Sequence, residues 1–285
     1  MRFRIVTRVV LRVQAMSSKR KRKHESSRNT TDEKEIPQGS ANLVGFSGDI
    51  TRSSNKCIKV ERTRLAKSFY NKDCETLAKA LLGKLLVRHC KDTGEKLSGL
   101  IVETEAYLGG EDKGAHSYNG KKTTRNEAMY MEPGTCYVYN IYGMYCCVNI
   151  SSEGEGAAVL LRALDPVDGL DHMQIIRSQK TMKEKDLCNG PSKLCQALKI
   201  SKDKFNKVDL TKSDEIWLEE GEDVPKTKIV TSARINIDYA EEWAKKPLRF
   251  YVLGNKSISK RDKPAEASQP KQTDTNYLIE DITIK

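Results

Sequence analysis

The pattern of apolar residues predicts that the folded part of the chain begins near Arg64. Between residues 73 and 83, apolar side chains recur at helical spacing, at Leu77, Ala78, Leu81 and Leu82. Asp73 can cap the start of this helix, and Gly83 can end it. These signals together predict a helix over residues 73–83.

Residues 97–107 follow a period of two, which predicts a strand with two different faces. The alternation is expected to place Ile101, Glu103, Glu105 and Tyr107 on one face, and Leu100, Val102 and Ala106 on the other. A carboxylate in this position is held on rigid backbone beside an aromatic ring. The pattern alone does not choose between Glu103 and Glu105, which share this face.

Further apolar runs predict additional strands and two more helices. Strands are expected over residues 84–88, 136–141, 145–151, 157–164, 215–218, 229–237 and 248–252, and helices over 168–180 and 190–198. Two of these strands are joined near Tyr142, Gly143 and Met144. This tip is bulky and apolar for a turn that faces solvent, because hairpin tips usually prefer Asn, Asp and Gly.

Tyrosine is concentrated in the middle of the chain. Seven of the eleven tyrosines lie between Tyr107 and Tyr145, together with His116 in a long polar loop over residues 109–126. A dense set of tyrosines can be ordinary core. Tyrosines that bracket acidic and imidazole groups indicate instead a pocket for a flat, electron-poor ring, and the apolar-flanked Arg162 follows them in the sequence.

The net charge of +11 comes mainly from the N-terminal end. Residues 1–28 contain ten Lys or Arg and one acidic residue, whereas residues 60–285 contain 36 basic and 34 acidic residues. The overall charge therefore does not by itself predict that the folded region binds nucleic acid. A binding face there would have to come from local basic patches.

Residues 1–60 are expected to form a disordered basic tail, because residues 25–60 are too polar to offset their chain entropy by burial. The Arg-rich, acid-free residues 1–16 resemble a mitochondrial transit peptide, or an extension upstream of a start at Met16. The basic run over residues 19–23 is typical of a nuclear import signal or a non-specific nucleic-acid arm. The nucleus is the expected location, with the mitochondrion as the alternative.

Composition and cysteine spacing argue against membrane-spanning and zinc-binding proteins. No apolar run reaches the length of about 18 residues that a membrane span needs, so no membrane association is expected. None of the eight cysteines forms a CxxC pair, and zinc-ligand spacing is absent. We expect reduced, mostly buried thiols. The pattern carries no signal of assembly, and a monomer is expected.

Several long motifs resemble those of the alkyladenine DNA glycosylase family, also called 3-methyladenine or N-methylpurine DNA glycosylases. They are E-T-E-A-Y, A-H-S, Y-V-Y-N-I-Y-G-M-Y, L-L-R-A-L, G-P-S-K-L-C-Q-A-L and W-A-K-K-P-L-R-F-Y, in that order between about Leu65 and Gly254. The resemblance implies a catalytic domain over residues 61–254, followed by a polar C-terminal tail over residues 255–285. Beyond Gly254 the sequence departs from the animal pattern.

The resemblance implies a fold and an activity. The fold would be a mixed α/β (α+β) single domain around a curved, largely antiparallel sheet, with a protruding hairpin that enters DNA. The activity would be monofunctional: flipping an alkylated or deaminated purine, such as 3-methyladenine, 7-methylguanine, ethenoadenine or hypoxanthine, out of double-stranded DNA and hydrolysing its N-glycosidic bond. No metal or cofactor would be used.

The resemblance also implies roles for individual residues. Glu105 would activate the water, oriented by Arg162 and the backbone carbonyl of Ile235. The base pocket would consist of Tyr107, His116, Tyr139, Asn149 and Leu160, with the Asn149 amide rejecting guanine. Tyr142 would intercalate into DNA beside Met144 and Tyr145, and Thr123, Ser192 and Lys193 would contact the DNA backbone.

Two other classes of function remain open at this point. One is a damage-recognition module that binds altered DNA without turnover, against which Glu105 and Arg162 argue. The other is formyl-group transfer or sugar hydrolysis on an analogous scaffold, in which the Tyr142 wedge would have no purpose.

Overall fold

The computed structural model describes residues 62–178 and 180–269. The predictions for residues 1–60 and for the end of the C-terminal tail, residues 270–285, lie outside the described residues. The strands are β1 (Leu85–Cys90), β2 (Glu95–Tyr107), β3 (Cys136–Ile141), β4 (Tyr145–Ser151), β5 (Ala158–Asp168), β6 (Ile216–Glu219), β7 (Ile229–Ser232) and β8 (Arg249–Val252). The α-helices are α1 (Lys67–Tyr70), α2 (Cys74–Ala80), α3 (Leu170–Arg177), α4 (Pro191–Ala197), α5 (Lys202–Phe205) and α6 (Lys263–Ala267). Short 3₁₀ helices are η4 (Tyr118–Gly120), η5 (Glu127–Tyr130), η6 (Glu184–Asp186), η7 (Lys226–Lys228) and η8 (Asp238–Lys245).

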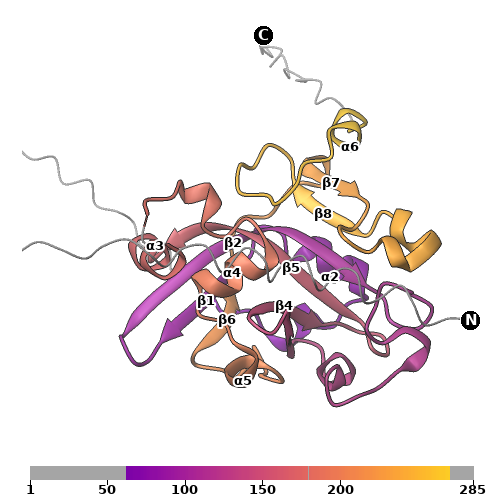
Figure 1. Cartoon of the computed structure of the whole chain (residues 1–285), viewed down its shortest axis with the longest axis horizontal. Helices are drawn as coiled ribbons and strands as arrows, with labels where there is room; N and C mark the ends of the chain where they lie inside the picture. Colours follow the sequence, from indigo (N-terminus) through magenta and orange to yellow (C-terminus); the bar gives the residue numbers. More distant parts are fainter. Residues whose placement is uncertain (1–61, 179, 270–285) are drawn as a thin grey trace, which may run out of the picture. The chain divides into compact units, whose positions relative to one another are not determined.

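The described strands form one eight-stranded sheet in which every pairing is antiparallel. Their order is β3-β4-β5-β2-β1-β6, and β8 pairs with β2 and β7 outside this path. Figure 1 shows β2 as the long strand beside β5, with β7 and β8 next to each other. This mixed α/β architecture around an open, curved antiparallel sheet confirms the expected fold class.

Strand β2 has different neighbours in its two halves. Its first half, residues 95–100, pairs with β1, whereas residues 103–105 pair with β8 along the same edge. Strand β5 accompanies β2 on the opposite edge as far as Tyr107. The second half of β2 is therefore fixed on both edges, which makes it a rigid support for side chains.

Two β-bulges, one on β2 and one on β5, interrupt the pairing of these strands. Each reverses the alternation of side chains between the two faces of its strand. Ile101 pairs with Leu164 and Thr104 pairs with Leu161, but the one pair between them joins Glu103 to Ala163. Val102 on one strand and Arg162 on the other are thus the extra residues. Because each strand gains one residue, the register is the same on both sides of the bulges.

The bulges overturn one detail of the expected alternation. Ile101 packs in the main core with Ala106, and Val102 packs in a second cluster with Ala163 and Tyr251. A regular period of two would place Ile101 and Glu103 on one face of the strand. In the structure they lie on opposite faces. An extra residue shifts the parity of a strand, so successive residues 102 and 103 lie on the same side.

Helix α2 lies where the apolar stripe predicts it. The Asp73 carboxylate accepts a hydrogen bond from the Thr76 backbone N–H over 2.9 Å, and Leu77 and Ala78 are fully buried. The Thr104 hydroxyl donates to the Ala78 carbonyl, which ties α2 to the core side of β2. Gly83 comes after the helix with a φ of +81°, a conformation that glycine adopts without strain.

The C-terminal part of the sheet differs from expectation in its extent. The strand expected over residues 229–237 ends at Ser232, because residues 233–237 leave the sheet with Asn236 at a φ of +61°. Residues 255–269 continue past β8 as an ordered segment that contains α6. Ser257 and Ile258 in this segment are buried, so it packs against the sheet.

Candidate active site

Glu105 lies in the second half of β2 and is fully buried. Its Oε1 accepts a hydrogen bond from the backbone N–H of Ile235 over 2.8 Å and lies 3.2 Å from Nη1 of Arg162. Its Oε2 accepts a hydrogen bond from the Tyr107 hydroxyl over 2.9 Å. Three donors around one carboxylate fix its position and its orientation. The structure thus brings together all three residues expected at the catalytic centre.

Ile235 reaches Glu105 through its backbone N–H group. The sequence assigns a role to its backbone carbonyl, whereas the contact seen in the structure is made by the N–H of the same residue. This contact attaches the segment after β7 directly to the carboxylate. Ile235 also lines the open groove above it.

Arg162 connects Glu105 with a second buried carboxylate. Its Nε donates to Oε1 of Glu103 over 3.3 Å, while Nη1 contacts Glu105. Burial alone would lower the pKa of Arg162, but the two carboxylates raise it on balance. A guanidinium held between two carboxylates keeps its charge at the centre of the site.

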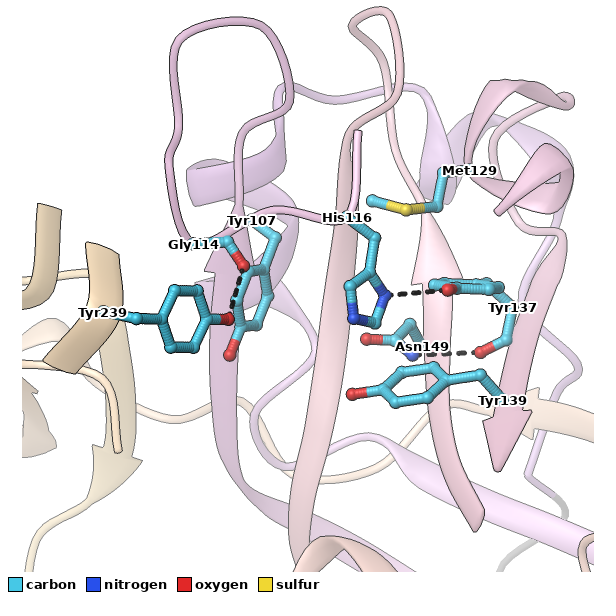
Figure 2. Close-up of a pocket in the computed structure, with 8 residues that line it drawn as sticks. All are labelled: Tyr107, Gly114, His116, Met129, Tyr137, Tyr139, Asn149 and Tyr239. Atoms are coloured by element: carbon cyan, nitrogen blue, oxygen red, sulfur yellow. Dashed lines mark hydrogen bonds between the residues drawn. The ribbon is translucent and has the colours of Figure 1, made fainter. Parts of the chain in front are cut away.

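An aromatic pocket opens beside this centre. Figure 2 shows the Tyr107 ring facing His116 across a gap, with Tyr137, Tyr139 and Asn149 behind the imidazole. The pocket has a volume of about 40 Å³, and it shares Tyr107 and Tyr139 with a neighbouring groove of about 650 Å³. Flat aromatic faces attract an electron-poor or cationic ring placed between them.

The protonation of the His116 imidazole is perturbed by its burial in the pocket. Burial, with a smaller contribution from the charge of Arg125, lowers the pKa of His116 from 6.5 to about 4. Nδ1 of its ring and the Tyr137 hydroxyl share a hydrogen bond of 2.8 Å. The ring is therefore neutral at physiological pH, and it does not repel a positively charged base.

Asn149 and Leu160 complete the pocket and the groove. Asn149 lies within β4 rather than at a strand end, and its Nδ2 donates to the Tyr137 carbonyl over 3.0 Å. The amide nitrogen is thereby bonded to β3, and the side chain also lines the cavity. Leu160 pairs with Glu105 across the β2–β5 ladder and lines the groove.

A buried ion pair lies against the ring of Tyr107. Arg234 and Asp112 form two parallel hydrogen bonds of 2.6 and 2.7 Å, and both side chains are fully buried. The Arg234 guanidinium lies 4.6 Å from the centre of the Tyr107 ring. This pair joins the loop after β2 to the segment after β7, which are the two segments beside the pocket.

The β3–β4 hairpin presents its apolar tip to solvent. Tyr142 is 93% exposed with a φ of +50°, and Met144 is 76% exposed. Tyr145 is exposed at 37%, at the base of the same tip. An exposed aromatic at a hairpin tip buries nothing within the fold, so its location fits a contact with another molecule.

The three residues expected to contact the DNA backbone lie in different environments. Ser192 lines the groove at the start of α4. The Lys193 ammonium donates to the Asn189 side chain over 2.7 Å. Both the backbone N–H and the hydroxyl of Thr123 donate to Asn126, whose amide in turn donates to the His116 carbonyl. The Thr123 loop is thus linked to the base pocket.

Several pocket residues carry no clear signal in the sequence. Tyr137 holds His116 through their shared hydrogen bond, and Tyr239 lies beside Tyr107 with its hydroxyl 3.4 Å from the Gly114 carbonyl. Arg125 lies 5.4 Å from the Tyr139 ring. Tyr137 could have been found by alternation, because residues 137 and 139 share a face of one strand.

Residues 62–178 and 180–269 contain no helix that is long and apolar enough to cross a membrane. Within the same ranges, no group of three or more His, Cys, Asp or Glu side chains is arranged to hold a metal ion. The seven cysteines in the described part of the chain are free, and six of them are buried.

Comparisons with known proteins agree with the resemblance of the motifs. The sequence profile of the family "Methylpurine-DNA glycosylase (MPG)" matches residues 68–256. DNA-3-methyladenine glycosylase from Mus musculus is 51% identical over 220 residues, covering 74% of this chain and 66% of the relative. Its Homo sapiens counterpart is 50% identical over 212 residues, covering 72% and 70%. A Clostridium perfringens protein named putative 3-methyladenine DNA glycosylase is 47% identical over 207 residues, covering 70% of this chain and 100% of the relative.

These matches place the chain among the DNA glycosylases, the class of enzymes that hydrolyse N-glycosyl bonds. More particularly, the chain belongs to the methylpurine-DNA glycosylase family, which confirms the resemblance of its motifs. The chain spans about two thirds of the length of the mouse relative, 66%, so its own substrates are a matter for proposal.

Proposed function

We propose that this protein removes alkylated or deaminated purines from double-stranded DNA by hydrolysing the N-glycosidic bond, and that it works as a monomer without a metal or cofactor. The observation that carries the proposal is the buried Glu105 carboxylate beside a pocket walled by Tyr107 and His116. A fixed carboxylate next to a flat aromatic pocket suits a reaction at the sugar carbon that carries the bound base.

In the proposed reaction, Glu105 accepts a proton from a water as the water oxygen bonds to C1′ of the flipped nucleotide. The bond between C1′ and the purine nitrogen breaks, and its electron pair leaves with the base. General base catalysis of this kind contributes about 10²–10⁴-fold. Arg162 and the backbone of Ile235 keep the carboxylate in place through their contacts of 3.2 and 2.8 Å.

The proposed base pocket selects its substrate by stacking and by exclusion. In this arrangement Tyr107 lies on one side of the base, and His116 and Tyr139 lie together on the other side. The ring centres of His116 and Tyr139 are 4.7 Å apart. A cationic alkylated purine gains about 0.5–2 kcal/mol from aromatic faces. The Asn149 amide at the cavity would crowd an exocyclic 2-amino group and thereby reject guanine.

Flipping requires that the gap in the DNA stack be filled. We assign this role to Tyr142, which stands exposed at the hairpin tip with Met144 beside it. Apolar wedges of this kind unstack base steps in the minor groove. Thr123, Ser192 and Lys193 would hold the flanking phosphates, and such contacts position the protein without reading sequence.

The proposed cellular location and a second proposed contact with DNA both rest on the basic N-terminal residues 1–28. Its basic run over residues 19–23 supports import into the nucleus, and the Arg-rich residues 1–16 support the mitochondrion as the alternative. A stretch with a charge of +9 would add non-specific, salt-sensitive binding to DNA.

An excision assay tests this function. A duplex that carries one ethenoadenine or one hypoxanthine is incubated with the full chain and then treated with alkali, which cleaves the strand at abasic sites. We expect strand cleavage at the lesion and none in the undamaged duplex. Tight binding without any abasic product, for every lesion tried, would instead assign a binding module.

The variant Glu105→Gln tests the assigned base. It preserves the size of the side chain and is expected to retain DNA binding while the single-turnover rate falls by at least about 10²-fold. Glu215→Gln is the matched control, since it removes a carboxylate from the partly buried pair with Arg88 near the β1–β6 edge of the sheet. Full activity of Glu105→Gln would show that another group is the base.

A further inference from the structure

Glu103 is a second fully buried carboxylate that the proposed reaction does not use. It lies on β2 two residues before Glu105. Its Oε1 accepts hydrogen bonds from Nε of Arg162 over 3.3 Å and from Nη1 of Arg249 over 2.9 Å. Its Oε2 accepts a hydrogen bond of 2.6 Å from the backbone N–H of Ser259. A buried charge with this many donors is held in one orientation.

Arg162 is held by three different partners at once. Its Nε reaches Glu103, its Nη1 reaches Glu105, and its Nη2 donates to the Ser259 hydroxyl over 3.2 Å. Only the Glu105 contact involves the proposed catalytic base. The other two contacts determine where the guanidinium plane lies, and therefore how it meets Glu105.

The segment after β8 supplies part of this arrangement. Ser259 contributes both its backbone N–H and its hydroxyl, while Arg249 on β8 also donates to the Lys260 carbonyl over 2.8 Å. Asn255 and Ser257 fasten the same segment to Asp165 on β5. A stretch of chain far from β2 in sequence is thus built into the support of Arg162.

We infer that Glu103, fixed by Arg249 and the Ser259 backbone, is a positioning residue that holds Arg162 against Glu105. The inference rests on the proposed function, because it assigns Glu103 an effect on the rate of the Glu105 reaction. Its physical basis is orientation: without the Glu103 carboxylate, the guanidinium keeps only Ser259 and Glu105 as partners, and it can rotate away from Glu105 or pair with it differently. Small misplacements of a catalytic contact cost about 10²-fold in rate.

The variant Glu103→Gln tests this positioning role. The amide keeps one acceptor oxygen but loses the charge that both arginines share. We expect the single-turnover rate of excision to fall by about 10–100-fold, with DNA affinity within about twofold of the wild type. Unchanged excision by Glu103→Gln, in a preparation whose wild type is active, overturns the inference and leaves the proposed function standing. An inactive wild type overturns both.

A double-mutant cycle separates positioning from a general loss of stability. If Glu103 acts through Arg162, then Glu103→Gln should cost less than about twofold when it is added to Arg162→Lys. A purely structural role would give the same loss of rate in both backgrounds, and that result overturns the inference. Glu215→Gln serves again as the control for losing a partly buried carboxylate near the β1–β6 edge of the sheet, where no change in rate is expected.

Ser259→Ala keeps the test decisive if Glu103→Gln does not fold. It removes the hydroxyl that accepts from Arg162 but leaves the backbone N–H that Glu103 needs. We expect a smaller decrease of about three- to tenfold in the single-turnover rate, with DNA affinity unchanged. A rate equal to that of the wild type overturns the inference.

Discussion

The Tyr107 hydroxyl donates a hydrogen bond of 2.9 Å to Glu105, two residues before it on the same strand. Residues two apart on a strand share a face, so the pocket wall and the carboxylate belong to one rigid element. Burial, together with the charge of Glu105, raises the pKa of Tyr107 well above its usual value. Tyr107 therefore remains a donor throughout the physiological range.

Tyr107→Phe separates the two roles of this residue. The variant retains the aromatic wall but removes the donor to Glu105. We expect an excision rate about 10–150-fold lower, because one hydrogen bond of about 1.5–3 kcal/mol to a charged acceptor is lost. Single-turnover kinetics with an ethenoadenine duplex measure this. A larger loss for Tyr107→Phe than for Tyr107→Ala would contradict the assignment.

Tyr142→Ser tests the wedge at the hairpin tip. Because Tyr142 is 93% exposed, its removal should leave the melting temperature unchanged. Excision from a duplex should fall by about tenfold or more, since unstacking costs a few kcal/mol. The ratio of rates on duplex and single-stranded substrates is the decisive measurement. Met131→Ser, at a 40% exposed apolar residue outside the hairpin, should leave this ratio unchanged.

His116 gives a prediction for stability as a function of pH. Its pKa is about 4 in the folded protein and 6.5 in the unfolded chain. Between these values only the unfolded state binds the proton, so the contribution of His116 to stability is complete above about pH 6.5 and is lost as the pH falls towards 4. The melting temperature of His116→Gln should therefore depend less steeply on pH in this window. Equal slopes would refute the lowered pKa.

Asp112→Asn tests the ion pair behind Tyr107. Removing one charge from a fully buried pair leaves Arg234 uncompensated, which typically destabilises a protein by about 3–5 kcal/mol. For a domain of this size, the melting temperature should fall by about 6–20 °C. Glu132→Gln, which breaks the exposed pair with Lys67, should cause no measurable shift. Similar shifts in melting temperature for the two variants would show that the buried pair contributes no more to stability than the exposed pair.

The sequence predicts most of the sheet and the main site residues, because alternation, helix caps and long motifs are local signals. It places Glu105, Tyr107 and Arg162 correctly as neighbours through the resemblance of the motifs. The face of Ile101 is the instructive exception. Alternation assumes a regular strand, and the extra residues at the bulges depend on pairing between β2 and β5, which no local pattern encodes.

Contacts that join distant segments were equally beyond the local pattern. Ser259 lies in a polar stretch with no motif, and its contact with Glu103 arises only because β8 pairs with the same part of β2. Tyr239 comes shortly after a stretch predicted as strand, yet it belongs to η8 beside the pocket. Charges buried by tertiary packing cannot be distinguished from surface charges by composition alone.

The paired bulges decide where these strands can change length. Because residues 102 and 103 lie on the same side, deletion of Val102 alone would leave a regular alternation in which Glu105 and Tyr107 keep their facing, with Arg162 still the extra residue of β5. Deletion or insertion of one residue between Thr104 and Tyr107 would instead turn Tyr107 towards the main core. Single-residue changes of length are therefore expected to be tolerated at the bulge and excluded from the part of β2 that carries the site.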